Sequence, residues 1–203
     1  AITLNAAMTK NFLRLLISAA ATLLLFWLLS VGLGPAPPLG PFLNPSTGFW
    51  ANAVTDGPSD LVTALPAGTL EDTVSIHVDG HNIPHIIAEH TRDLYFAQGY
   101  ITARDRLWQM EFQTHAAAGR LSEILGQDML EYDRYQRRIG MVYAAEQALE
   151  GMLGHPETAA AAEAYAAGVN AWIDRLDAAG YPLEYKILNY KPERWTPLKT
   201  ALL

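Results

Sequence analysis

The longest run of apolar positions lies near the start of the chain, from Leu15 to Leu33, where 19 consecutive residues carry no charge and Leu and Ala predominate. A helix of this length, at about 1.5 Å per residue, can just cross a hydrocarbon core of about 30 Å. A core helix of a soluble protein fits less well, because the run passes directly into a Pro-rich stretch. We therefore predict that residues 1–33 form an export signal or a membrane anchor.

Charged residues flank this run unequally. Lys10 and Arg14 precede it, and the next basic residue is Arg92. Since basic residues mark the cytoplasmic side of a span, we expect the later part of the chain to be periplasmic or otherwise extracytoplasmic, anchored to the inner membrane by residues 15–33. The stretch Gly34–Pro38 offers no clean small-x-small cleavage site, which favours an uncleaved anchor.

Residues 34–70 contain seven Pro and five Gly together with many Ser, Thr and Asn. Neither a helix nor a central strand tolerates this composition, so we predict a Pro/Gly-rich linker. Phe42, Phe49 and Trp50 are too apolar for a free linker. We expect part of the segment to pack against a folded body.

From residue 71 the polar and apolar positions follow first a strand period and then a helix period. Two apolar, β-branched runs at 73–78 and 83–88 enclose an Asp-Gly-His-Asn turn, which predicts a β-hairpin. Helical spacing starts at Thr91, the expected N-cap, and ends at Gly119. Further helical segments are predicted at 121–125, 134–152 and 156–179, and a new helix starts at Thr196-Pro197.

Asp105 falls in register with the apolar stripe of the long helix, which runs through positions 94, 97, 101, 108 and 112. A carboxylate buried there without a partner would cost several kcal/mol, so Arg104, Arg106 or Arg120 should lie close to it. A catalytic acid and a structural ion pair both remain open.

The 203 residues carry a net charge of −7 and include no Cys. Only four charged residues precede residue 71, so residues 71–203 resemble one ordinary acidic globular segment after an almost uncharged leader. The acidic balance and the lack of a Lys/Arg run argue against nucleic-acid binding. The lack of Cys excludes disulfides, thiolate metal sites, a Cys nucleophile and a lipid-modified Cys.

His77, His81 and His85 recur at every fourth position, the spacing of two metal ligands on one helix face. Gly80 and Pro84 interrupt any helix there, and we expect the three rings to diverge in a strand-turn-strand. Solvated or locally hydrogen-bonded histidines are therefore preferred to a metal-dependent hydrolase site.

Other candidate chemistry is weak. Glu111 and Glu123 could serve as the two carboxylates of a glycosidase, but nothing in the sequence sets their separation. Ser122 is expected to cap a helix, since no Gly-x-Ser-x-Gly, Ser-x-x-Lys or Gly-rich phosphate loop is present. The residues alone contain no convincing catalytic constellation.

Several blocks, in family order, resemble the α-chain region of the penicillin acylase family of N-terminal-nucleophile hydrolases. The blocks are IPHI at 83–86, DLYFAQGY at 93–100, ARDRLWQME at 103–111, GRLSE at 119–123, YAAGVNAWI at 165–173 and YKPERWTP at 190–197. The chain departs from the family pattern at Asn82, where Gly is usual, at Arg104, where Gln is commoner, and at His115, near a position often held by Arg. Asn tolerates a left-handed turn, so the turn at Asn82 can survive.

This resemblance implies an α+β fold, the four-layer αββα arrangement, to which residues 71–203 would contribute mainly helices and an N-terminal β-hairpin. It also implies a precursor that cuts itself into an α and a β chain, with the new N-terminal Ser of the β chain as nucleophile. That Ser would lie beyond Leu203, so no catalytic or metal-binding residue is assigned here. The signature positions are expected to be structural: Pro84, His85, Asp105, Arg106, Trp108, Gln109, Gly119, Arg120 and Glu123. With that role, we expect Asp105→Ala to impair maturation or stability.

The implied partners are the β chain of the same precursor, a small N-acyl substrate and, through the N-terminal helix, the membrane. No cofactor is expected in this part, and calcium belongs to the complete enzyme. The implied reaction is cleavage of N-acyl amide bonds, as in β-lactam side chains or acyl-homoserine lactones. We expect the chain to be a fragment, since a helix starts at Thr196 and the sequence stops at Leu203. The alternative is a non-catalytic, membrane-tethered helical interaction module or a remnant.

Overall fold

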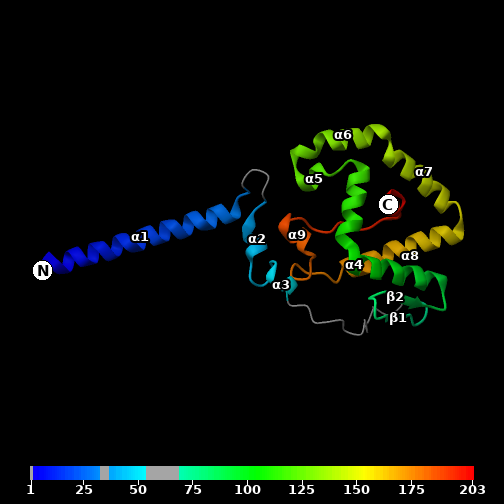
Figure 1. Ribbon diagram of the computed structural model, residues 1–203, viewed down its shortest axis with the longest axis horizontal. Coiled ribbons are helices and arrows are strands. Elements are labelled where there is room, and N and C mark those ends of the chain that lie inside the picture. Colours follow the sequence, from blue (N-terminus) through cyan, green and yellow to red (C-terminus); the bar gives the residue numbers. More distant parts are fainter. Residues whose placement is uncertain (1, 33–36, 54–68) are drawn as a thin grey trace.

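The computed structural model describes residues 2–32, 37–53 and 69–203. One long helix projects from a body of packed helices, and a small hairpin lies at the edge of that body (Figure 1). The N-terminal part comprises α1 (Ile2–Ser30), α2 (Leu39–Leu43) and α3 (Trp50–Ala53). The body comprises β1 (Ser75–Val78), β2 (Pro84–Ile87), α4 (Thr91–Ala118), α5 (Ser122–Leu125), a 3-10 turn (Gln127–Met129), α6 (Leu130–Ile139), α7 (Met141–Leu153), α8 (Pro156–Ile173), α9 (Leu183–Ile187) and α10 (Pro197–Leu202).

The predicted β-hairpin is confirmed. Strands β1 and β2 pair antiparallel, with Ser75 opposite Ile87 and Val78 opposite Pro84. The Asp79 carboxylate accepts hydrogen bonds from the backbone N–H groups of His81 and Ile83, both at 2.9 Å, and so closes the turn. Asp79 therefore supplies the local hydrogen bonds that an Asx-type turn requires.

Helices α4 and α8 cross so closely that their backbones touch. A Cβ built on Gly168 would lie 1.9 Å from the carbonyl oxygen of Phe96, and one on Gly99 would lie 2.2 Å from that of Tyr165. Only glycine fits at either position. Around this crossing the core gathers buried side chains from α4, α8 and the C-terminal segment: Ala103, Leu107, Met110, Ala166, Val169, Tyr185 and Trp195.

The long helix α4 is kinked in its middle. Arg106 has φ −143° and ψ 23°, which lies outside the helical region. The residues after the kink are therefore rotated from the register that an unbroken 3.6-residue period predicts. Leu94 belongs to the predicted stripe but is 37% exposed, whereas Ala103 and Leu107 are buried. Leu94 and Ala103 both precede Arg106, so this offset reflects the side of α4 on which α8 packs and not the kink.

Several predicted helix limits differ from the structure. The single helix expected over 134–152 is two helices, broken at Gly140, whose φ of 78° is left-handed. Helix α8 ends at Ile173, earlier than predicted, and α9 was not predicted. Thr91 is the first helical residue of α4, so the N-cap is His90. The predicted start at Thr196 is correct, because its side chain accepts a hydrogen bond from the N–H of Lys199.

Part of the predicted linker packs against the body, as expected from its aromatic residues. The Nζ atom of Lys186, in α9, donates to the carbonyl oxygen of Gly48 at 3.1 Å and to Oδ1 of Asn52 at 2.6 Å. The Asn52 side chain in turn donates to the carbonyl oxygen of Tyr181 at 3.0 Å. Predictions that concern residues 54–68 fall outside the described part of the chain.

Helix α1 contains the one segment, among the described residues, that is long and apolar enough to cross a membrane. This segment is Met8–Ser30, and none of its most apolar window is buried against the rest of the protein. Its hydroxyl groups are satisfied within the helix, for example Thr22 by the carbonyl oxygen of Ser18 at 2.9 Å. Such a helix places no unsatisfied hydroxyl in a hydrocarbon environment.

Candidate functional site

A buried polar cluster lies between α4 and the C-terminal segment, with Glu111 at its centre. Glu111 is only 1% exposed. The hydroxyl of Tyr185 donates to its Oε2, and the backbone N–H of Glu193 donates to its Oε1 at 2.9 Å. Lys199 Nζ lies 3.9 Å from the same Oε1. These partners replace the water that Glu111 loses on burial, which would otherwise be costly.

A second carboxylate, that of Glu193, joins distant parts of the chain. Nη2 of Arg120 donates to its Oε1 at 2.8 Å and Nη1 donates to its Oε2 at 3.3 Å. Lys199 Nζ donates to its Oε2 at 3.0 Å. Arg120 also holds Glu123, through Nε to Oε1 at 2.9 Å and Nη2 to Oε2 at 2.6 Å. The network thereby ties the loop after α4 to the start of α10.

His115 and Tyr190 close one side of the cluster. Nδ1 of His115 lies 3.0 Å from the carbonyl oxygen of Glu111, and because a carbonyl can only accept, Nδ1 carries a proton. The hydroxyl of Tyr190 lies 3.3 Å from Nε2 of His115 and 3.4 Å from Oε1 of Glu111. Its single proton can serve only one of these acceptors at a time.

The positive charges of Arg120 and Lys199 largely balance the negative charges of the carboxylates in the cluster. Burial raises the pKa of Glu193, but the hydrogen bonds from Arg120 and Lys199 outweigh burial and hold this pKa at about 2. Burial, followed by the negative charge of Glu111, raises the pKa of Tyr185 and Tyr190 well above the ordinary value of 10.0. Both phenols therefore remain protonated donors at neutral pH.

The cluster does not fit a calcium ion. Glu111, His115 and Glu193 do bring three potential ligand atoms within 4.8 Å of one another. However, calcium prefers oxygen ligands over imidazole. The positive charges of Arg120 and Lys199 already lie against these carboxylates. With every acid group paired and every phenol protonated, the arrangement supports structure and offers no open nucleophile.

Three signature positions from the sequence meet at this cluster: Gly119, Arg120 and Glu123. Gly119 ends α4 with a left-handed conformation, φ 64° and ψ 50°. A Cβ there would lie 2.5 Å from the carbonyl oxygen of Asp133, so two separate constraints require glycine. The turn at Gly119 places Arg120 within hydrogen-bond distance of Glu193. Glu123 follows Arg120 by about one helical turn.

Four other signature residues lie at the α4 kink instead. Asp105 has 39% of its side chain exposed and pairs with neighbouring Arg104, Nε to Oδ1 at 2.6 Å. The expectation that Asp105 lies on the buried face is therefore wrong, because the buried face here is centred on Tyr100, Ala103 and Leu107, beside the predicted stripe. Trp108 packs edge-on against Tyr185, with ring centroids 5.1 Å apart. Gln109 lines a hollow of about 440 Å³ together with residues of the kink.

Pro84 and His85 lie in the hairpin, apart from both groups. Nε2 of His85 lies 3.2 Å from Oδ2 of Asp79. His85 is also the register partner of His77, so these two side chains start from the same face of the hairpin. Among the described residues, only the cluster around Glu111 brings three potential ligand atoms of these types within 4.8 Å.

The sequence analysis did not identify two buried aspartates, Asp133 and Asp93, as hydrogen-bond acceptors of the fold. Asp133 is 3% exposed and accepts the N–H groups of Leu121 and Ser122, both at 2.8 Å. It caps α5 from a distance, so the prediction that Ser122 is the cap is wrong. Asp93 similarly accepts the N–H groups of Glu71 and Asp72, each at 2.9 Å. The only local signal was an Asp in the first turns of α4 and α6.

Comparison with known proteins identifies the class to which this fold belongs. The family model described as penicillin amidase matches residues 73–203, and the chain belongs to that family. Over 145 residues, covering 69% of the chain, it is 31% identical to penicillin G acylase of Escherichia coli. It is 39% identical over 128 residues, 63% of the chain, to penicillin acylase 2 proenzyme of Pseudomonas sp. strain SE83.

The relatives are not confined to penicillin acylases. The chain is 35% identical over 138 residues, 68% of its length, to the acyl-homoserine lactone acylase QuiP of Pseudomonas fluorescens strain Pf0-1. The solved thermostable penicillin G acylase from Alcaligenes faecalis superposes with a TM-score of 0.58 at 25% identity, over 64% of this chain and 69% of that one.

The chain spans about one sixth of the length of these curated relatives, with coverage of 17%, 16% and 16%. The matched part is mostly helical with one two-stranded sheet among the described residues. The family and its N-terminal region are thus established.

Proposed function

We propose that this chain is the α-chain region of an exported, self-processing amidohydrolase that cleaves N-acyl amide bonds, and that it serves as scaffold. The complete enzyme would have the four-layer αββα fold, with the β chain supplying the inner sheets. One observation carries the scaffold role. The signature residue Arg120 joins Glu193 across 73 residues. Glu111, the other buried carboxylate of the cluster, is held by Tyr185 and by the N–H of Glu193.

The proposed chemistry lies in the β chain. Its N-terminal Ser would attack the amide carbonyl through Oγ, while its free α-amine takes the hydroxyl proton. Backbone N–H groups and an Asn side chain would stabilise the oxyanion. When the tetrahedral intermediate collapses, the α-ammonium gives its proton to the leaving nitrogen, the C–N bond breaks, the amine departs and an acyl ester remains on the Ser. Water then cleaves this ester to give the carboxylic acid and regenerate the enzyme.

The substrate class follows from the relatives, which are named as acylases of penicillin and of acyl-homoserine lactones. Both reactions separate a carboxylic acid from an amine that belongs to a lactam- or lactone-bearing nucleus. We therefore assign this chain's enzyme to small N-acyl substrates of that kind. Any calcium ion would bind elsewhere in the complete enzyme.

The proposed location is the extracytoplasmic face of the inner membrane, with α1 as the anchor. Its support is the apolar segment Met8–Ser30, whose most apolar window is not buried against the rest of the protein. Lys10 and Arg14, near its N-terminal end, set the orientation.

The experiment that tests this proposal begins with the gene downstream of the Leu203 codon. A continuing frame is expressed, and mass spectrometry is used to look for two chains, the second starting with Ser. Hydrolysis of penicillin G and of acyl-homoserine lactones is measured in parallel. Replacing the new N-terminal Ser by Ala should abolish both processing and hydrolysis, and restoring Ser should recover them. A single unprocessed chain without hydrolysis would contradict the enzyme and favour the interaction module.

A further inference from the structure

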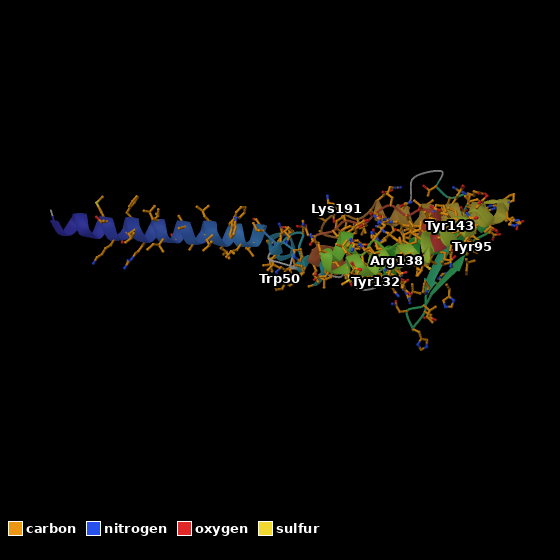
Figure 2. All side chains as sticks on the ribbon, turned by 90° about the horizontal axis from the view of Figure 1, so that it is seen from above. Trp50, Tyr95, Tyr132, Arg138, Tyr143 and Lys191 are labelled. Carbon is orange, nitrogen blue, oxygen red and sulfur yellow. The ribbon has the colours of Figure 1, made fainter. Side chains whose placement is uncertain are left out.

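Next to the proposed anchor lies a compact segment, residues 39–53, that exposes large apolar side chains. Trp50 is 56% exposed, Leu39 46% and Leu43 44%. Leu39 and Leu43 are four residues apart in α2 and so share one face of that helix. Trp50 lies at the end of the body that α1 joins, whereas Tyr143 lies toward the opposite end (Figure 2).

This segment is attached directly to α1. A Cβ built on Gly40 would lie 3.0 Å from the carbonyl oxygen of Leu29, in the last turn of α1. Helix α2 therefore packs against the end of α1 at close backbone contact. If α1 spans a bilayer, α2 begins where the hydrocarbon core meets the headgroups.

Several backbone N–H groups of this segment donate hydrogen bonds to acceptors within the segment itself. The Asn44 side chain accepts the N–H groups of Ser46 and Thr47, at 2.9 and 3.1 Å. The N–H of Gly48 donates to the carbonyl oxygen of Asn44 at 2.8 Å, and that of Phe49 donates to Phe42 at 3.0 Å. Because polar groups at the edge of a hydrocarbon phase must find partners, this closed pattern suits an interfacial position.

The segment is also held rigidly by the body. Lys186 Nζ donates to Gly48, to Asn52 and, at 2.7 Å, to the carbonyl oxygen of Ala179. The rings of Phe42 and Phe49 stack with centroids 5.0 Å apart, and Phe49 contacts Trp50 at 4.3 Å. The exposed apolar side chains are thus presented on a fixed support.

We propose that residues 39–53 insert their exposed apolar side chains into the outer headgroup region of the bilayer and seat the body directly on the membrane surface. This inference depends on the anchor role of α1 under the proposed function. Trp is enriched at this depth because its ring is apolar and its indole N–H is polar. Leu39 and Leu43 would reach the acyl boundary, as the apolar face of an interfacial helix does.

The test uses the full chain reconstituted in phosphatidylcholine vesicles. Because the sequence contains no Cys, single nitroxide labels can be placed through Leu43→Cys, Trp50→Cys, Leu24→Cys and Tyr143→Cys without further changes. Collision with dissolved oxygen, which concentrates in lipid, is compared with collision with a water-soluble nickel complex. Tyr143 is the matched aromatic control, 68% exposed and far from α1.

We expect oxygen to dominate at positions 24, 43 and 50, and the nickel complex to dominate at 143. If oxygen collisions dominate at position 24 but nickel collisions dominate at positions 43 and 50, α1 is an anchor but residues 39–53 do not enter the membrane. That result would overturn the inference. If nickel collisions dominate at position 24, α1 is not in the membrane, and the inference about residues 39–53 is wrong as well. Shielding from both reagents at 43 and 50 would mean that protein covers the segment, which also overturns the inference. None of these outcomes bears on acylase chemistry.

Discussion

Arg120 and Glu193 lie 73 residues apart in the chain, yet the guanidinium of one donates to both carboxylate oxygens of the other, at 2.8 and 3.3 Å. Glu193 simultaneously accepts from Lys199 at 3.0 Å. This pair is therefore the point at which the loop after α4 and the start of α10 are fastened together. Glu123, the other carboxylate that Arg120 contacts, lies only three residues away from Arg120 in the chain.

We expect Glu193→Gln to lower the free energy of unfolding by about 2 kcal/mol, because three charge-assisted hydrogen bonds, from Arg120 and Lys199, lose their acceptor charge. Glu123→Gln is the matched control, since it removes a more exposed and local ion pair with Arg120. It should cost under about 1 kcal/mol. Urea unfolding in mild detergent, followed by near-ultraviolet circular dichroism, measures both. Equal losses in the two variants would contradict the fastening role of Glu193.

The same pair gives a defined pH dependence. The pKa of Glu193 is about 2 in the folded protein, against an ordinary value of 4.5. A carboxyl whose folded pKa is depressed stabilises the fold above its unfolded pKa, and that contribution is lost as pH falls through the folded pKa. The stability difference between the native chain and Glu193→Gln should be constant above about pH 4.5 and shrink toward pH 2. A difference that stays constant on acidification would contradict this linkage.

Local signals explain which elements were predictable. Pro156 and the Thr196-Pro197 pair start helices because a proline fits the first helical turn and a Thr side chain can cap it. The hairpin followed from two apolar runs around an Asp-Gly turn. In each case the residues that decide the structure lie within a few positions of one another.

The candidate site was not predictable in this way. Glu111 and Glu193 meet only after α4 and the C-terminal segment pack together, so no local spacing reveals the cluster. The outward position of Asp105 depends on which side of α4 packs against α8. The buried face is centred on Tyr100, Ala103 and Leu107, whereas the apolar spacing of the sequence assigned Asp105 to it. Gly140 was a visible break signal, but Ile139 and Met141 on either side continued the apolar pattern.

Gly119 offers a test of backbone geometry. Gly119→Ala places a Cβ in a left-handed residue and 2.5 Å from the carbonyl oxygen of Asp133. Gly140 has a similar φ of 78° but no atom within 4 Å of a built Cβ. Gly140→Ala should therefore cost about 1 kcal/mol from the left-handed conformation alone. Gly119→Ala should exceed it by about 1 kcal/mol or more, because of the added contact.

The α4–α8 crossing offers a second glycine comparison. Gly168→Ala would force apart two helices whose backbones touch, and we expect a loss of about 3 kcal/mol. Gly151→Ala is the control, in the exposed part of α7 with no atom within 4 Å of a built Cβ. It should stabilise the protein by about 0.5 kcal/mol or more, as Ala favours a helix over Gly. Opposite signs in thermal unfolding are expected, and a neutral Gly168→Ala would contradict the close crossing.

Lys186 determines whether the segment 39–53 stays on the body. It is 7% exposed, and its Nζ donates to Gly48, Asn52 and Ala179. Lys186→Met keeps the length and apolar stem of the side chain but removes all three donors, so the segment should open more often while the body remains folded. Losing about 1.4 kcal/mol of local stability would raise thermolysin cleavage between residues 42 and 50 about tenfold.

The control for this change is Lys191→Met, which removes an exposed lysine close by in the sequence and should leave cleavage unaltered. Near-ultraviolet circular dichroism should be the same for both variants, since neither substitution touches the core around Glu111. If Lys186→Met instead unfolds the body, the lysine supports the core as a whole. If cleavage does not change, the stacking of Phe42 on Phe49 holds the segment without the lysine. Because only a segment fixed to the body can set the distance between that body and a membrane, this comparison decides whether α1 would carry a rigid or a loosely tethered domain.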